Sequence, residues 1–289
     1  MSQKKVVNGG VYEGERALFM TENAHIEGAT FQNGESPLKE SRDLTLHNVT
    51  FKWKYPLWYV NNAVCTNCYL SITARSGIWY TNHIVMNNCV VDAPKTFRRA
   101  SFIVLNDTQI NHGEESLWSC SNIKLNNVKV KGDYFGMNSI DVEVNHMEID
   151  GNYLFDGGKN IVVRDSILNS KDAFWNTENV TIINSKIIGE YLGWNSKNVT
   201  LINCEISSLQ GLCYMEKIKL VNCKLLDSSL VLEYCSDIDA DIIDEVESIK
   251  NPTSGVIKVK GVKNLIIDEH SFDKDRKKTR IINQDGKEI

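Results

Sequence analysis

Asn179-Val180-Thr181-Ile182-Ile183-Asn184-Ser185-Lys186-Ile187 is a stretch that the chain repeats, nearly unchanged, at residues 198–206 and 217–225. Apolar residues alternate with polar ones, an Asn follows, and a second short alternation begins out of phase. Alternation with a period of two predicts a strand, and Asn favours a turn. A unit this short cannot bury its apolar face alone, so it must stack on copies of itself.

The repeat extends over most of the chain. The first apolar residue of each unit, here called the anchor, recurs every 19 to 21 residues. The position four residues after the anchor is Asn, Asp or His in ten of twelve units. These residue types tolerate a left-handed backbone, which a tight turn requires. The twelve anchors are Ala24, Leu44, Ala63, Ile84, Ile103, Ile123, Val142, Ile161, Val180, Val199, Ile218 and Ile238.

A third apolar segment precedes each anchor by six residues and carries only apolar residues or Gly. Three short strands and three turns in about 19 residues leave no room for a helix. We therefore predict an all-β, single-stranded right-handed parallel β-helix of about twelve coils with an Asn ladder, its coils spaced about 4.8 Å apart. The β-helix is expected over residues 16–250, with an N-terminal cap at 1–15 and a C-terminal cap or tail at 251–289. The alternative is a leucine-rich-repeat solenoid, whose repeats are usually longer.

Composition excludes several classes of protein. With 42% hydrophobic and 24% charged residues, the chain of 289 residues is expected to be globular. A net charge of −5 gives no basic footprint for nucleic acid. No run of about 18 apolar residues is present to span a membrane. The N-terminus has no hydrophobic segment typical of a secretory signal, so a cytoplasmic protein is expected. No metal or other cofactor is expected.

The eight cysteines fit the repeat better than a set of disulfides. Cys65 and Cys68 form a C-x-x-C pair, which in other contexts indicates a metal or redox site. Neighbouring units hold Leu46, Met86 and Leu105 at the position of Cys65. We therefore predict buried, reduced thiols that pack as small apolar side chains. Four of them share the repeat position just after the turn: Cys68, Cys89, Cys204 and Cys223.

The segments Trp53-Lys54-Tyr55-Pro56-Leu57-Trp58-Tyr59 and Tyr191-Leu192-Gly193-Trp194-Asn195, together with the Asn column, carry a resemblance. From about residue 12 to 250 the chain resembles the pectate-lyase-like β-helix superfamily, and within it a group of uncharacterised bacterial proteins. The resemblance implies the fold, and a polysaccharide-binding face on the strand before the first turn. The chain lacks the Asn-Thr-Asp, Asp-Asp, Gly-His-Gly and Arg-Ile-Lys motifs of polygalacturonase-like members, so no activity is implied.

Five of the six tryptophans follow the inward position six residues before the anchor, and so should point outward. We interpret this column as an exposed platform for sugar rings, because large exposed apolar patches usually mark interaction sites. A homo-oligomer interface and a purely structural stack are the alternatives. The predicted substrate-binding residues are Trp58, Tyr59, Trp79, Tyr80, Arg99, Trp118, Trp175 and Trp194.

Ionisable residues are densest around Arg98, near Arg75, Lys95, Glu114 and Glu115. Arg98 could hold a sugar carboxylate or serve in a lyase, with Glu115 as its acid–base partner. Alternatively, Arg98 is held between the indoles of Trp79 and Trp118 by cation–π contacts.

Three functional hypotheses follow, and they leave open whether the chain is an enzyme. The favoured one is a carbohydrate-binding or carbohydrate-active β-helix protein whose partner is an oligo- or polysaccharide. The second is a scaffold or homo-oligomeric interaction protein. The third is a polysaccharide lyase or glycoside hydrolase that uses Arg98 and Glu115.

Overall fold

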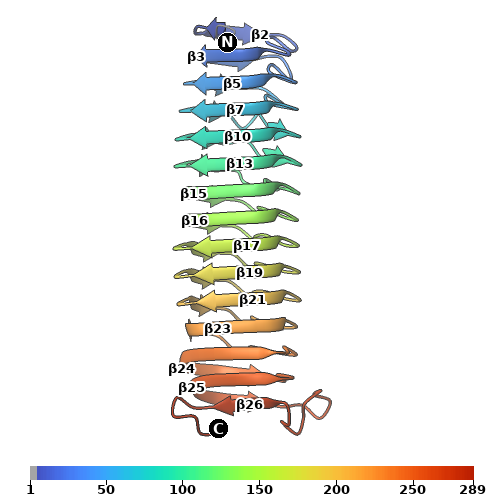
Figure 1. The fold of residues 1–289 in the computed structure, drawn as a ribbon, viewed down its shortest axis with the longest axis vertical. Helices are drawn as coiled ribbons and strands as arrows, with labels where there is room; N and C mark the ends of the chain where they lie inside the picture. Colours follow the sequence, from blue (N-terminus) through green and yellow to red (C-terminus); the bar gives the residue numbers. More distant parts are fainter. Residues whose placement is uncertain (1–4) are drawn as a thin grey trace. The chain divides into compact units, whose positions relative to one another are not determined.

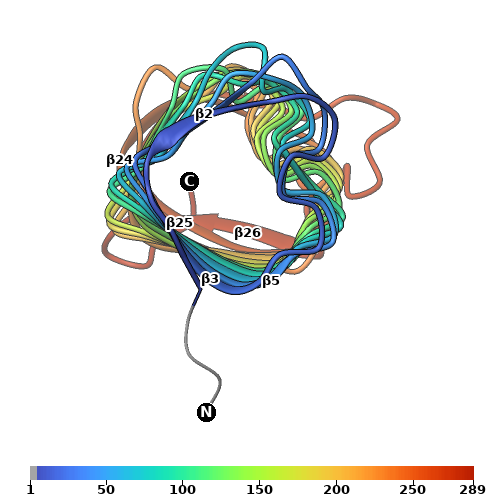
Figure 2. The same cartoon turned by 90° about the horizontal axis from the view of Figure 1, so that it is seen from above.

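A computed structural model describes residues 5–289, which consist of strands and turns with no helix. They form two compact units, residues 5–149 and 150–289, each a single-stranded parallel β-helix. The absence of any helix from these residues excludes the leucine-rich-repeat alternative, and no segment of them could cross a membrane as a helix. The turns are right-handed (Figures 1 and 2), as nearly all crossovers between parallel strands are.

The first unit stacks one strand per coil on its anchor face. These strands are β1 (Lys5–Val7), β3 (Glu22–Glu27), β5 (Arg42–His47), β7 (Asn61–Thr66), β10 (Asn82–Asn87), β13 (Ser101–Asn106), β15 (Ser121–Lys131) and β16 (Ile140–Asp150), whose last residue opens the second unit. The second face holds β2 (Gly10–Glu13), β4 (Ala29–Gln32), β6 (Thr50–Phe51), β8 (Tyr69–Leu70), β11 (Val90–Val91) and β14 (Gln109–Ile110). The third face has only the short pair β9 (Ile78–Trp79) and β12 (Phe97–Arg98).

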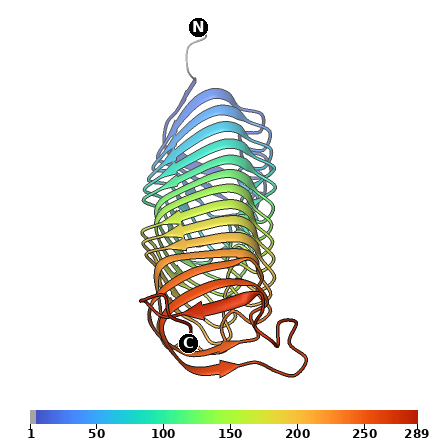
Figure 3. The ribbon, with the colours of Figure 1, turned by 60° about the horizontal axis from the view of Figure 1, so that its bottom comes forward.

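The second unit repeats this plan. Its anchor strands are β17 (Lys159–Arg164), β19 (Glu178–Ile183), β21 (Lys197–Ile202), β23 (Glu216–Leu225), β24 (Ile238–Lys250), β25 (Gly255–Ile266) and β26 (Thr279–Ile282). Its second face holds β18 (Ile167–Asn169), β20 (Lys186–Ile188) and β22 (Glu205–Ser207). Figure 3 shows the chain leaving the stack as a loop between β25 and β26.

The strand register confirms the predicted anchors. Ala63 pairs with Leu44 on one side and Ile84 on the other, and in the second unit Val180 pairs with Ile161 and Val199. Every anchor is buried. Parallel pairing in exact register brings equivalent side chains into contact, so each repeat position becomes a column of side chains.

The pairing extends into both segments that were expected to be caps. Of the N-terminal segment, residues 1–4 lie outside the described residues, while β1 and β2 pair with β3 and β4 as a full coil. At the other end, β25 and β26 continue the anchor face beyond residue 251. The C-terminal coils differ in length from the repeat of about 19 residues, because Ala240 pairs with Ile257 and Ile257 with Ile281. A search for that repeat therefore misses them.

The turn position has the predicted left-handed backbone, with φ between 48° and 65° in eleven of the twelve units. Its amides form the Asn ladder on the outer surface. Asn203, for example, donates to Asn184 Oδ1 at 3.1 Å and accepts from Asn222 Nδ2 at 2.8 Å. A second ladder lies one residue earlier and is partly buried, linking Asn87, Asn106, Asn126 and Asn145.

Replacing Asn203 with leucine should lower the free energy of unfolding by about 1–3 kcal/mol. Two ladder hydrogen bonds are lost, and leucine is strained at a φ of 53°. Replacement with glycine should cost less, because glycine accepts this backbone without strain. Urea denaturation followed by circular dichroism measures both. Equal stability of the leucine variant and the unmodified chain would show that the ladder contributes nothing.

All eight cysteines are buried and free, which confirms the core interpretation of the C-x-x-C pair. Burial raises the pKa of the Cys120 thiol to about 12 and has the same effect on Cys213. The thiols of Cys120 and Cys213 are therefore protonated at neutral pH. Within residues 5–289, no cluster of His, Cys, Asp and Glu side chains is arranged to hold a metal ion.

Candidate functional site

The outward residues of four successive coils in the first unit form one closed stack, here called the indole column: Trp58, Trp79, Arg98 and Trp118. The indoles of Trp58 and Trp79 lie 5.3 Å apart and nearly parallel, at 8°. The guanidinium carbon of Arg98 lies 4.8 Å from the Trp79 ring centre and 5.0 Å from that of Trp118. Both faces of Trp79 are therefore covered by its neighbours.

The indole N–H groups of Trp58 and Trp79 are also hydrogen-bonded. Trp58 Nε1 donates to the Ser76 carbonyl at 2.6 Å, and Trp79 Nε1 donates to the Lys95 carbonyl at 2.8 Å. All three tryptophans of the column are half-buried. The sequence predicted an exposed platform, but the coil spacing presses each ring against the next. A sugar could not stack on either face of Trp79 unless the column opened.

Arg98 and Glu115, the two residues predicted to be catalytic, lie in contact. Arg98 Nη2 is 3.0 Å from Glu115 Oε2, and Lys95 Nζ is 3.1 Å from Glu115 Oε1. The Arg98 side chain is only 24% exposed. Its Nε is buried and has no hydrogen-bond partner in residues 5–289. This geometry is the one expected for an arginine held between two indoles and neutralised by a carboxylate.

A second column runs beside the indole column and is here called the tyrosine column: Tyr59 and Arg99, which are exposed, and Tyr80, which is half-buried. The two phenol rings are stacked at 4.9 Å and 9°, and Arg99 lies over Tyr80 at 6.0 Å. Each residue has a left-handed backbone, with φ between 49° and 58°, and directly follows a member of the indole column. That corner turns its side chain toward solvent, and Tyr59 is 48% exposed.

The polar groups of the tyrosine column are unoccupied. Neither phenol hydroxyl makes a hydrogen bond within the described part of the chain, and the Arg99 guanidinium has no ion pair there. In this the column differs from the indole column, whose polar atoms mostly bind one another or the backbone. Tyr59, Tyr80 and Arg99 are among the predicted substrate-binding residues, but the repeat could not reveal that their polar groups remain available.

Sequence reasoning missed a second aromatic pair three residues further along. His83 and Phe102 are stacked at 4.4 Å and 2°, and Phe102 is 46% exposed. Both have left-handed backbones at a position that is Asn or Asp in most other coils. An aromatic residue where the repeat favours Asn was the available signal, because φ above zero is costly for a bulky side chain.

The remaining predicted tryptophans, Trp175 and Trp194, lie in the second unit. Their rings are 5.9 Å apart and tilted by 38°, and Trp194 also packs on Tyr214 at 4.7 Å. Trp175 Nε1 donates to the Tyr191 carbonyl at 2.6 Å. These indoles are half-buried like those of the first unit, and the stack contains no arginine.

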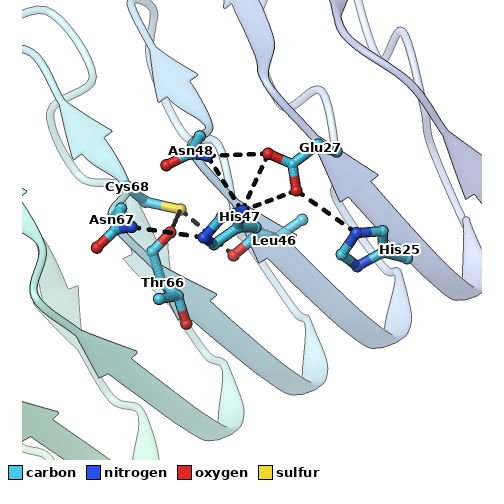
Figure 4. A network of polar contacts seen from close by, with 8 residues as sticks. All are labelled: His25, Glu27, Leu46, His47, Asn48, Thr66, Asn67 and Cys68. Atoms are coloured by element: carbon cyan, nitrogen blue, oxygen red, sulfur yellow. Dashed lines mark hydrogen bonds and ion pairs between the residues drawn. The ribbon is translucent and has the colours of Figure 1, made fainter.

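Figure 4 shows another polar cluster that the sequence did not reveal, on β3 and β5. Glu27 lies between two histidines, with His47 Nδ1 at 2.7 and 2.9 Å and His25 Nε2 at 3.6 Å from its carboxylate. Asn48 donates to the same carboxylate at 2.9 Å. That hydrogen bond, followed by the one from His47, lowers the pKa of Glu27. The charged side chains of the cluster are partly exposed and its groups satisfy one another, as in a surface ion-pair network.

Fold and surface together define a right-handed parallel β-helix protein with closed aromatic stacks and, in its first unit, the tyrosine column. Tyr214 and Tyr234 stack at 5.4 Å at the equivalent repeat position of the second unit, and Tyr214 is 41% exposed. The chain belongs to the family described as "Protein of unknown function (DUF3737)", whose model matches residues 5–282. A comparison with curated proteins found no match.

Several solved β-helix structures are similar at low identity. A PL6 alginate lyase in complex with a trisaccharide is 9% identical, with a TM-score of 0.45, covering 99% of this chain and 89% of its own. The surface adhesin PfbA of Streptococcus pneumoniae is 12% identical, with a TM-score of 0.41 and coverage of 96% and 82%. The A-module of the mannuronan C-5 epimerase AlgE4 from Azotobacter vinelandii is 10% identical, with a TM-score of 0.40 and coverage of 96% and 90%.

Proposed function

We propose that this chain is a carbohydrate-binding protein whose first unit holds an acidic oligosaccharide along the tyrosine column. The observation that carries the proposal is the set of unoccupied polar groups on Tyr59, Tyr80 and Arg99. Two phenol hydroxyls and one guanidinium follow one another at the coil spacing of about 4.8 Å. A linear polymer that lies along the coils meets one such group on each coil.

The chemistry of these groups favours a sugar that carries a carboxylate. A planar guanidinium binds a carboxylate through two parallel hydrogen bonds, with a geometry that lysine cannot reproduce. A phenol hydroxyl both donates and accepts, as sugar hydroxyls do. The tyrosine rings are rigid, so little conformational entropy is lost on binding.

Binding is favoured over catalysis because the side chains of the tyrosine column carry no carboxylic acid or imidazole. The imidazole of the neighbouring column, His83, is stacked on Phe102 at 4.4 Å. General acid–base catalysis needs such a group within hydrogen-bond reach of the substrate. Glu115, the predicted acid–base residue, is held by Lys95 and Arg98.

Isothermal titration of the full chain with oligogalacturonate, and with a neutral glucan of equal length, tests the proposal. The acidic ligand should bind and the glucan should bind at least about tenfold more weakly, because the contact between charged groups is absent. Arg99→Ala should weaken acidic binding about tenfold or more, and Arg99→Lys should recover only part of the loss.

Arg16→Ala is the matched control, because Arg16 is exposed on the same unit and packs over a ring, that of Phe19, at 5.2 Å. It should leave binding unchanged. Equal affinity for acidic and neutral sugars, or an Arg99→Ala variant that binds normally, would contradict the proposal. Absence of sugar binding together with a dimer that Arg99→Ala dissociates would instead support the homo-oligomer interface.

A further inference from the structure

Two surface columns of the first unit end on the same coil. The tyrosine column ends at Arg99, and the stack of His83 and Phe102 ends at Phe102. A ring inside a stack has both faces covered, whereas the last ring offers one. The outer face of Phe102 meets no ring or cation elsewhere in residues 5–289, and nearly half of this residue is exposed.

The next coil offers only small side chains at the equivalent positions. Ser101 pairs with Ser121 and Ile103 with Ile123, so Asn122 occupies the position that follows Phe102. Arg98 bridges to Trp118, so Ser119 occupies the position that follows Arg99. Ser119 and Asn122 are both exposed and both have left-handed backbones. Beyond the phenyl ring and the guanidinium, the surface therefore steps down to a hydroxyl and an amide. We call Arg99, Phe102, Ser119 and Asn122 the step.

The residue type at Phe102 departs from the repeat. Its φ is 54°, a conformation that glycine and asparagine adopt far more readily than phenylalanine. Asn62 and Asn122, at the equivalent position in nearby coils, are the residue types expected there. Phe155 and Phe174 have similar φ values but are buried, so what distinguishes Phe102 is an exposed ring where the repeat favours Asn or Asp.

We infer that the step binds one uronic-acid ring at the end of the acidic oligosaccharide. The apolar C–H face of the sugar packs on the open face of Phe102, and its carboxylate pairs with the Arg99 guanidinium. Ring hydroxyls exchange hydrogen bonds with Ser119 and with the Asn122 amide. This inference rests on the proposed function because Arg99 takes part in both. It adds a terminal subsite, and therefore a fixed end to the bound chain.

Asn122→Phe tests the step by filling it. The new ring would continue the stack beyond Phe102, just as Phe102 continues the stack beyond His83, on a backbone that already carries φ of 55°. Asn62→Phe is the matched control, because it lengthens the same stack at its His83 end and leaves the step open. The probes are galacturonic acid and its linear tetramer, with binding followed by ligand-observed NMR and isothermal titration.

The unmodified chain and Asn62→Phe should bind both probes. Asn122→Phe should lose binding of the monosaccharide and bind the tetramer about tenfold more weakly. Phe102→Asn, which places the usual residue type at this position and relieves the strain, should also weaken binding of the monosaccharide. Unlike Asn122→Phe, the Phe102→Asn variant introduces no larger side chain, so its folding does not depend on space for one.

Three results would overturn the inference. In the first, Asn122→Phe and Phe102→Asn bind both probes like the unmodified chain while Arg99→Ala loses the tetramer. The step is then empty, although the proposed function stands. In the second, Asn62→Phe weakens binding as much as Asn122→Phe, so the effect does not come from the step. In the third, the unmodified chain binds neither probe, which contradicts the proposed function as well.

Discussion

Replacing Lys250 with methionine should lower the free energy of unfolding by about 3–4 kcal/mol, a large effect for a single substitution. Lys250 Nζ lies 2.8 Å from Glu233 Oε1, and the Glu233 side chain is only 5% exposed. Gln210 Nε2 donates to the other carboxylate oxygen at 2.9 Å. Methionine preserves the apolar stem, so the variant leaves a buried carboxylate without its cation. Such a charge costs much more than the pair itself contributes.

A second substitution separates this cause from lost packing. Adding Glu233→Gln to Lys250→Met removes the uncompensated charge and should restore most of the stability. Lys159→Met is the control for an exposed pair, because Lys159 and Glu178 lie 2.9 Å apart with both side chains about half exposed. It should cost far less. Urea denaturation of the full chains measures all three, and a loss for Lys250→Met no larger than for Lys159→Met would contradict the prediction.

The same pair predicts a pH dependence. The hydrogen bond to Glu233 raises the pKa of Lys250 above its usual value of about 10.4. Because the folded chain holds this proton more tightly than the unfolded chain, the stabilisation is complete below pH of about 10 and is lost as the pH rises through the folded value. Stability measured between pH 9 and 12 should therefore fall less steeply in Lys250→Met than in the unmodified chain.

Replacing Trp79 with alanine should lower the free energy of unfolding by about 2–4 kcal/mol. An exposed sugar platform would predict little loss. Instead, the Trp79 ring lies between Trp58 and Arg98, and its indole N–H donates to the Lys95 carbonyl. Its removal leaves a gap in the column and separates Arg98 from one of its two rings.

Tyr59→Ala provides the comparison, because Tyr59 is 48% exposed and its hydroxyl makes no hydrogen bond within residues 5–289. It should cost about 1 kcal/mol or less. Thermal and urea denaturation of both variants give the difference directly. Equal losses for the two would mean that the indole column is no better packed than the exposed column beside it.

Much of the fold could be predicted because a parallel stack makes every coil obey the same rule. The anchors, the left-handed Asn positions and the buried cysteines follow from one period of about 19 residues. The ends could not be predicted in this way. Ile257 and Ile281 lie in register with the anchor face, but the intervals between them and Ala240 differ from 19. Pairing is fixed by strand contact and not by equal loop length.

The candidate site could be predicted only in part, for a physical reason. Repeat phase tells which side chains point outward, and it placed Trp58, Trp79 and Trp118 on the surface. Phase does not tell whether a side chain is already covered by the coil above or below. That depends on the sizes of neighbours about 4.8 Å away. Trp79 is covered from both sides, whereas Phe102 is covered from one side only.

The most direct test of the central claim is a crystal structure of the full chain soaked with linear tetragalacturonate. We expect the sugar to lie over Tyr59 and Tyr80, with a carboxylate on Arg99 and the stacking of Trp58, Trp79, Arg98 and Trp118 unchanged. A sugar stacked on an indole of an opened column, or bound away from Tyr59, Tyr80 and Arg99, would contradict the account.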